Sequence, residues 1–480
     1  MSLKDDAKRA RRRKIAWAAI ALLLAFGAGR FLLMRATDRD AWPAPAIGVD
    51  YDPTGVRSAE GTFASPEDFS AIVDGMLPPD PALVAEYHAY QACGFAEDET
   101  YPLVEARLRE TESARKAFDG VLDASAGLDP SAGSVVYNDV AGRSAEITLL
   151  GCYAAADMLR QGATNAAAAE IRYGLLRQAL KLTHGGGLLG RAAALNNAML
   201  VVREEIMEPV VWPDRKDCAA HVARVRALEE NLGDLDEALR ADWVSIRQSI
   251  DAMYAQMAET NAPSAKPGRR LSGKSAFFVN FLGGTEAGTR ANLDALLSRL
   301  VHNAASPYAP DGLTAGLPEW CRGTSRPPWT RDPIGAAVAS AYLKNAALGH
   351  AAGPGLLLEL RVSRIVAALQ WHRQSAGAYP ESLDALLATG LLEEADVRDP
   401  FSKDDAVRLG YQRDGDGWRL HSVGLDQEDG GGLVDAYRTA DAKAQRTADF
   451  VFISRERDVR LASYRAANPP PAPAPPAEGN

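Results

Sequence analysis

Apolar residues recur at alternating spacings of four and three over most of the chain before residue 400, and this periodicity constrains the fold more than any other feature. Such spacing gathers apolar side chains on one face of an α-helix. The clearest stripe follows the capping residue Asp234 and predicts a helix of about six turns. Its members are Leu235, Leu239, Trp243, Ile246, Ile250, Met253 and Met257.

The same pattern and a series of cap signals predict a largely helical protein. Further helices are expected over 102–122, 140–161, 166–182, 190–207, 216–232, 290–303, 334–348 and 355–376. A polar side chain before a proline or an acid, the usual start of a helix, occurs in Ser65-Pro66-Glu67-Asp68, Asp80-Pro81 and Asp332-Pro333. Because strand-like alternation is nearly absent, we expect an irregular bundle of antiparallel helices over residues 65–354.

An apolar segment near the N-terminus predicts a membrane anchor. Residues 15–34 read IAWAAIALLLAFGAGRFLLM, with Arg30 as the only charge, close to the roughly 20 residues that cross a bilayer as a helix. The basic residues within 1–14 favour a cytoplasmic N-terminus, which places the body in the periplasm of a bacterial envelope. The alternative is a cleaved secretory signal, and both interpretations export the body. Residues 35–64, rich in Pro, Gly and Ala, are expected to form a linker.

The charge is divided unequally along the chain. Residues 1–39 contain ten Lys or Arg and three Asp; subtracting them from 53 basic and 63 acidic residues leaves 43 and 60, a net charge of −17. An acidic body does not attract a phosphate backbone, so we expect a lipid bilayer and envelope proteins as partners, and no nucleic acid.

Four cysteines, Cys93, Cys152, Cys218 and Cys321, all follow the predicted anchor. In an oxidising compartment they could form two disulfides, with three possible pairings that the sequence does not distinguish. The alternative is buried free thiols. No CxxC pair occurs, which argues against a thioredoxin-like site or a zinc ribbon.

No motif predicts a catalytic residue or a bound cofactor. Residues 268–275 match the Walker A pattern and 185–190 match GxGxxG, but each follows a helical segment, whereas both phosphate-binding turns must follow a strand. We therefore expect a solvated basic loop and a helix–helix junction. Acid pairs such as Glu204-Glu205 are interpreted as solvated helix faces. An exported hydrolase remains the alternative, with a site assembled in the helical ectodomain from residues distant in sequence.

After Tyr379 the pattern changes to a small α+β module. Pro380-Glu381-Ser382-Leu383 predicts a short helix, and residues 407–413, 418–422 and 450–453 alternate as short strands. The sequence Asp-Gly-Asp-Gly at 414–417 is typical of a hairpin turn. We assign residues 355–455 to this module and residues 456–480, which end in a Pro-rich stretch, to a disordered tail.

This module resembles the C-terminal domain of the type II secretion major pseudopilins. The resemblance covers about 355–453 and rests on YPESLDAL at 379–386, DPF at 399–401, LGY at 409–411, WRLHSVGLD at 418–426 and DGG at 429–431. It implies a helix packed on a small antiparallel sheet and a calcium ion in the final loop, with Asp426 and Asp429 at acidic ligand positions. The alternative is a turn rich in Asp and Gly without an ion.

Several residues depart from the family pattern. Arg419 stands where the family has an acid, and an insertion separates Gly432 from Asp449. Pseudopilins also begin with a long apolar helix that packs into the filament core, whereas the helix at 355–376 is internal and contains Arg361 and Arg364. Together with the predicted anchor, these features favour a non-catalytic interaction or scaffold component, associated with a type II secretion or pilus-like system, over a pilin subunit.

Overall fold

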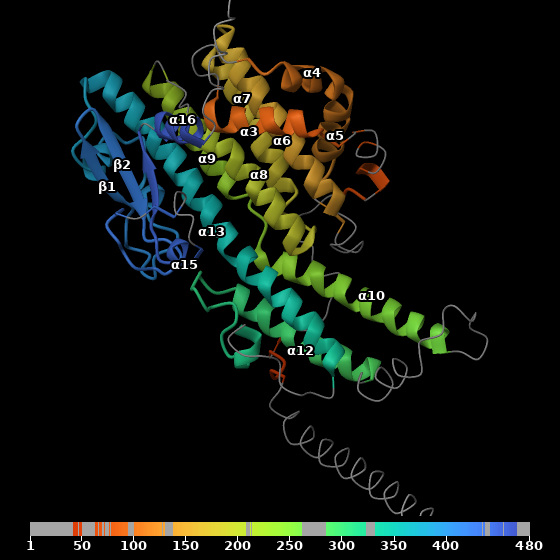
Figure 1. The fold of residues 1–480 in the computed structure, drawn as a ribbon. Helices are drawn as coiled ribbons and strands as arrows, with labels where there is room; N and C mark the ends of the chain where they lie inside the picture. Colours follow the sequence, from red (N-terminus) through yellow and green to blue (C-terminus); the bar gives the residue numbers. More distant parts are fainter. Residues whose placement is uncertain are drawn as a thin grey trace, which may run out of the picture. The chain divides into compact units, whose positions relative to one another are not determined.

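In a computed structural model, the described part of the chain is mostly helical, with one small antiparallel sheet near the C-terminus, as the sequence predicts (Figure 1). The structure describes residues 42–46, 48–49, 63–65, 67–69, 72, 76, 78–94, 100–126, 128–129, 138–207, 212, 214–261, 285–322, 332–433, 435–436, 442–454 and 456–467. The predicted anchor at 15–34 and the Walker-like motif at 268–275 lie outside these residues. Within them, no helix combines the length and apolar character that a membrane crossing needs.

The chain forms two compact units. The first comprises residues 1–51, 246–302 and 314–345, and the second comprises residues 52–245, 303–313 and 346–480. Helices α10 (Leu235–Asn261) and α13 (Pro333–Ala376) contribute residues to both. All of the residues discussed below as candidate sites belong to the second unit.

In the first unit, ion pairs join α10 to α12 (Glu286–Ala304). The Nε atom of Arg247 on α10 lies 2.9 Å from a carboxylate oxygen of Asp294 on α12. The Nε atom of Arg290 on α12 lies 2.9 Å from a carboxylate oxygen of Asp251 on α10. The predicted cap before α13 is confirmed, because Asp332 accepts a hydrogen bond from the Gly335 amide at 2.8 Å. A short 3-10 helix, Glu319–Arg322, also lies in this unit.

The helices of the second unit largely follow the predicted ranges. They are α3 (Pro81–Cys93), α4 (Pro102–Glu110), α5 (Glu112–Ala124), α6 (Asn138–Arg160), α7 (Asn165–Lys181), α8 (Gly187–Met207) and α9 (Arg215–Glu229). The Asp80 carboxylate caps α3 by accepting from the Leu83 amide at 2.8 Å. The segment 102–122, expected as one helix, is interrupted at Thr111. The GxGxxG residues connect α7 to α8, which confirms the predicted helix–helix junction.

Helix α13 is continuous over 44 residues, although the periodicity predicts two helices separated near residue 350. Pro354 lies inside it. An internal proline removes one backbone hydrogen bond and crowds the preceding turn. Burial outweighs this cost, since Leu356, Leu358 and Leu360 beside the proline have no exposed surface.

The sheet consists of β1 (Gly410–Asp414), β2 (Gly417–Ser422) and β3 (Phe450–Ile453), in the antiparallel order β1-β2-β3. The predicted turn joins β1 to β2. Ser382 caps the short helix α14 (Leu383–Leu387), a 3-10 helix covers Glu394–Val397, and α15 is Ala442–Gln445. Residues 456–467, which composition assigned to the disordered tail, form helix α16 (Glu456–Ala467) and pack against α3.

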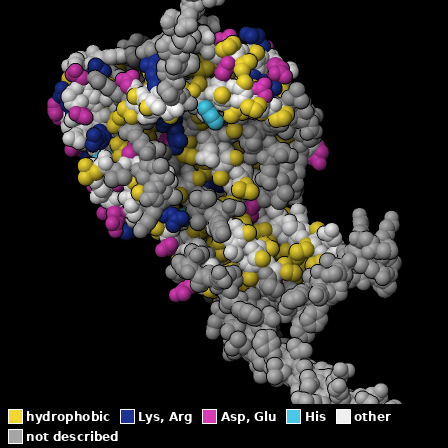
Figure 2. Space-filling view, in the orientation of Figure 1, with side chains coloured by type: hydrophobic (Ala, Val, Ile, Leu, Met, Phe, Trp, Pro, Cys, Tyr) yellow, Lys and Arg dark blue, Asp and Glu magenta, His cyan; other side chains and the backbone are white. Residues whose placement is uncertain are grey.

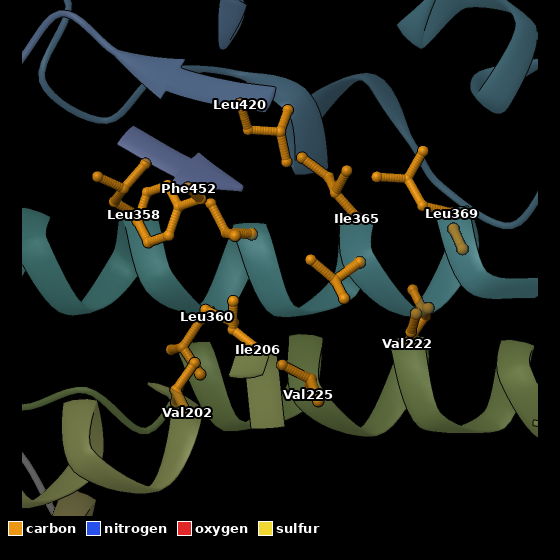
Figure 3. Packing of buried hydrophobic residues seen from close by; sticks show 14 of the residues in the cluster. Val202, Ile206, Val222, Val225, Leu358, Leu360, Ile365, Leu369, Leu420 and Phe452 are labelled. Carbon is orange, nitrogen blue, oxygen red and sulfur yellow. The ribbon is translucent and has the colours of Figure 1, made fainter. Parts of the chain in front are cut away.

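One hydrophobic cluster joins the sheet to the helices through α13. Figure 3 shows Leu420 of β2 and Phe452 of β3 on one side of α13, with Val202 and Ile206 of α8 on the other. Val222 and Val225 of α9 lie on this second side as well. The C-terminal module therefore shares its core with the helical body.

Two cysteines in this unit are free thiols. Cys152 and Cys218 are both buried and unbonded, so the arrangement with two disulfides is not formed. Burial raises the pKa of the Cys218 thiol to about 12, so the reactive thiolate is scarce at neutral pH.

Candidate metal centre

The loop that follows β2 is held at its base by Asp399. This buried carboxylate accepts hydrogen bonds from the Phe401 amide at 2.9 Å, the Ser422 hydroxyl at 2.8 Å and the Val423 amide at 2.8 Å. Burial raises the pKa of Asp399, and these donors oppose the shift. The Asp-Pro-Phe turn and the start of the loop are thus fixed together.

A second buried carboxylate, Asp449, organises the glycines of the loop. Its Oδ1 accepts from the Gly430 amide at 3.1 Å, and its Oδ2 accepts from the Gly432 amide at 2.6 Å. Gly432 has a φ of 68°, in the left-handed region that favours glycine. A Cβ atom at Gly424 would lie 2.4 Å from the carbonyl oxygen of Ala448, so the loop closes tightly on the residues before β3.

His421 presents its imidazole between two glycines. It pairs with Gly410 across β1 and β2, where a Cβ atom on the glycine would lie 2.0 Å from the ring. A Cβ atom on Gly432 would lie 3.2 Å from the ring on the loop side. The Nε2 atom of His421 is 3.3 Å from Oδ1 of Asp429, while Nδ1 has no hydrogen-bond partner among the described residues. The ring is therefore confined, with Nε2 directed at the loop.

His421, Asp429 and Asp449 together form a cluster of potential metal ligands. One donor atom from each side chain lies within 4.8 Å of the other two. Asp449 is buried, His421 is mostly buried, and the side chain of Asp429 is 65% exposed. The cluster thus opens to solvent on the side of Asp429, and two carboxylates with an imidazole are suited to a divalent cation.

The structure places one of the two predicted calcium ligands in this cluster. Asp429 belongs to it, whereas Asp426 lies outside and uses its Oδ1 to accept from the Glu428 amide at 3.1 Å. Calcium binding through Asp426 and Asp429 stays a prediction. His421 and Asp449 were not recognised from sequence. The signal that could have identified Asp449 is the pairing of the two strands predicted over 418–422 and 450–453. This pairing sets Ser422 opposite Phe450 and so brings the residue before β3 beside the loop.

The loop also contacts the segment 303–313. Gln427, with a φ of 64°, donates from Nε2 to the carbonyl oxygens of Tyr308 at 3.0 Å and Phe401 at 2.7 Å. The Tyr308 hydroxyl donates to the Leu425 carbonyl at 3.2 Å, and its ring stacks on His350 of α13 with centroids 4.9 Å apart. The loop is thereby tied to the helical part of the same unit.

A second polar group lies inside the helical body. The Tyr173 hydroxyl hydrogen-bonds to Nδ1 of His221, and Nε2 of His221 lies 3.4 Å from a carboxylate oxygen of Glu205. Ser363 donates to the other oxygen of Glu205 at 3.0 Å. All four residues are buried, so the expectation that Glu204-Glu205 forms a solvated face is wrong. The long-range packing of α8 against α13 determines this burial.

This buried group has catalytic residue types but is closed to solvent. Burial lowers the pKa of His221, which favours the neutral imidazole, and burial raises the pKa of Tyr173. The guanidinium of Arg224 covers the Tyr173 ring at 4.1 Å from its centroid. A hydrogen-bonded group of this kind satisfies polar atoms between helices and fixes their packing.

No family model, curated protein or solved structure matches the chain.

Proposed function

We propose that this protein is a membrane-anchored component of a bacterial envelope that acts as a non-catalytic scaffold, associated with a type II secretion or pilus-like system. Residues 15–34 would cross the inner membrane, with the N-terminus in the cytoplasm and the body in the periplasm. The observation that supports this most is the burial of α13 on two sides, between the sheet and helices α8 and α9.

A pilin subunit needs the helix beside its sheet for packing with other subunits. Here the corresponding helix is the C-terminal part of α13, where Leu358 and Leu360 have no exposed surface. Fully burying a leucine side chain stabilises a protein by about 1.5–3 kcal/mol, so uncovering this helix would be costly. The burial of this helix therefore favours a pseudopilin-like module that stays fixed to the helical body over a subunit that assembles into a filament.

Buried ion pairs reinforce the attachment of the module. Arg364 of α13 is 1% exposed and pairs with Glu229 of α9 at 2.7 Å and with Asp396 at 3.2 Å. Arg226 of α9 also pairs with Asp396, at 2.5 Å. Separating the module from α9 would break the Arg364–Glu229 and Arg226–Asp396 pairs, and Arg364 and Asp396, which both belong to the module, would keep only each other.

The surface supports protein partners in preference to nucleic acid. On the face seen in Figure 2, basic and acidic side chains of the described residues are interspersed. Nucleic-acid binding needs a broad basic patch that neutralises phosphates. Exposed apolar side chains include Leu433, which is 84% exposed, and Leu189, which is 52% exposed. These two positions suit the capture of a partner.

Site-specific photo-crosslinking in cells would test the scaffold. A photoreactive residue at Leu433 or Leu189 should yield discrete adducts with envelope proteins, whereas one at Leu103, 40% exposed on another helix, serves as a comparison. A reporter active only outside the cytoplasm, fused after residue 480, tests the topology. Absence of adducts from both Leu433 and Leu189, or an inactive reporter, would contradict the proposal.

The alternative of an exported hydrolase has the group Ser363–Glu205–His221 in its favour. Full-length protein in detergent would be treated with a serine-reactive phosphonate, with Ser363→Ala as the control. Covalent labelling that the substitution abolishes would favour the enzyme. An absence of labelling would agree with the buried position of Ser363, which is 2% exposed.

A further inference from the structure

We propose that His421, Asp429 and Asp449 bind a divalent transition-metal ion of the Zn²⁺ type, and that calcium is not the ion of this loop. The three side chains come from β2, from the glycine-rich loop and from the residue before β3. An ion among them would join three segments that are separate in sequence.

The donor atoms favour a transition metal. Calcium takes six to eight oxygen ligands, and imidazole nitrogen is not among its usual donors. Zinc and its neighbours accept imidazole nitrogen together with carboxylate oxygen. The cluster offers one nitrogen, from His421, and carboxylate oxygens from two aspartates. This combination matches a zinc site that keeps one or more positions for water.

One of the donor separations fits the same ion. Tetrahedral ligands at about 2.0–2.1 Å from zinc lie roughly 3.3–3.4 Å from one another. The separation of Nε2 of His421 and Oδ1 of Asp429 is 3.3 Å. A good N–H···O hydrogen bond is closer to 2.9 Å, so this contact is longer than a hydrogen bond alone would set.

The charge balance of the pocket calls for a cation. Asp449 is 2% exposed, and its carboxylate is held by the amides of Gly430 and Gly432. Burying a carboxylate is costly unless a positive charge lies nearby. Among the described residues no Lys or Arg forms an ion pair with Asp449, and His421 is the basic group of the cluster. A divalent ion would offset both carboxylates, leaving each Asp449 oxygen its amide hydrogen bond.

The ion would also stabilise the attachment of the loop. Gly430 and Gly432 pack closely on the ligands, because a Cβ atom would lie 3.1 Å from the Asp449 carboxylate at Gly430 and 3.2 Å from the His421 ring at Gly432. The ligands are therefore held close before an ion arrives. Gln427, in the same loop, donates to the Tyr308 carbonyl. Binding would therefore tighten the loop and its contact with the segment 303–313, while the exposed Asp429 gives the ion a path from solvent.

Titration calorimetry on the full-length protein in detergent, first stripped with chelator, would test the site with Zn²⁺ and with Ca²⁺ as probes. We expect one Zn²⁺ per chain and a higher melting temperature, with no effect of Ca²⁺ at the same concentration. Asp429→Asn, at an exposed position, should weaken Zn²⁺ binding by about tenfold or more, because loss of even an outer-shell partner costs about 10- to 100-fold.

Asp426→Asn is the matched control, since it removes a neighbouring carboxylate that lies outside the cluster. It should leave the Zn²⁺ affinity unchanged. His421→Gln, which keeps a polar side chain on β2, should weaken binding as Asp429→Asn does. Three results would overturn the proposal: no Zn²⁺ binding, Zn²⁺ binding that persists unchanged in Asp429→Asn, or Ca²⁺ binding that Asp426→Asn abolishes.

Discussion

Acidification should destabilise this protein in part through one histidine, His350 of α13. The imidazole is 7% exposed, stacks on Tyr308, and has no hydrogen-bond partner for either nitrogen among the described residues. Burial, together with the charge of Arg191, lowers the pKa of His350 from 6.5 to about 4. Arg191 itself is held by the carbonyl oxygen of Gly233 at 3.0 and 3.1 Å.

The sign of the effect follows from where the proton binds. Well above pH 6.5 the histidine is neutral in both states and contributes no pH dependence. As the pH falls from 6.5 towards 4, the unfolded chain takes up a proton that the folded protein does not, so the free energy of unfolding decreases. A shift of this size corresponds to about 3 kcal/mol, at 1.36 kcal/mol per pKa unit.

Urea denaturation of the full-length protein, followed by tryptophan fluorescence at several pH values between 7.5 and 4, would measure this contribution. His350→Phe removes the titration and keeps a ring to stack on Tyr308, so its unfolding free energy should fall less steeply with acid than that of the unaltered protein. The exposed His88, substituted with Gln, is the control and should retain the original slope. Equal slopes for His350→Phe and the unaltered protein would refute the reasoning.

Three other predictions concern stability. Arg364→Ala should cost about 1.5–3 kcal/mol in thermal or urea unfolding, because it removes a buried cation and leaves Asp396 with only Arg226 and Glu229 with only Arg361. Arg408→Ala, on the surface, should cost about 1 kcal/mol or less. Leu420→Ala should cost about 2–5 kcal/mol in the same assay, since it opens a cavity between the sheet and α13. Burial alone lowers the pKa of His184, but hydrogen bonding to Glu237 raises it above 6.5, so its contribution is complete below pH 6.5 and disappears as the pH rises through the folded-state pKa. Glu237→Gln should remove this loss on alkalinisation, and an unchanged pH profile would contradict it.

Local patterns in the sequence were sufficient for most of the secondary structure. The stripe from Leu235 onward is a helix that begins where predicted. The caps at Asp80 and Asp332 are also confirmed, since each carboxylate accepts a hydrogen bond from the backbone amide three residues later. The hairpin turn at 414–417 was also evident. These features depend on the order of neighbouring residues, which the sequence contains directly.

Tertiary structure decided the remainder, because each of the other features needs contacts between segments far apart in the chain. The sequence pattern predicted separate helices over 334–348 and 355–376, yet burial of α13 on two sides keeps that helix continuous. Glu205 was expected in solvent and lies inside, beside His221 and Ser363. Asp429 was identified from its loop, but only the pairing of β2 with β3 brings His421 and Asp449 to it. Sequence periodicity specifies which face of an element is apolar, whereas the partner of that face is determined by packing.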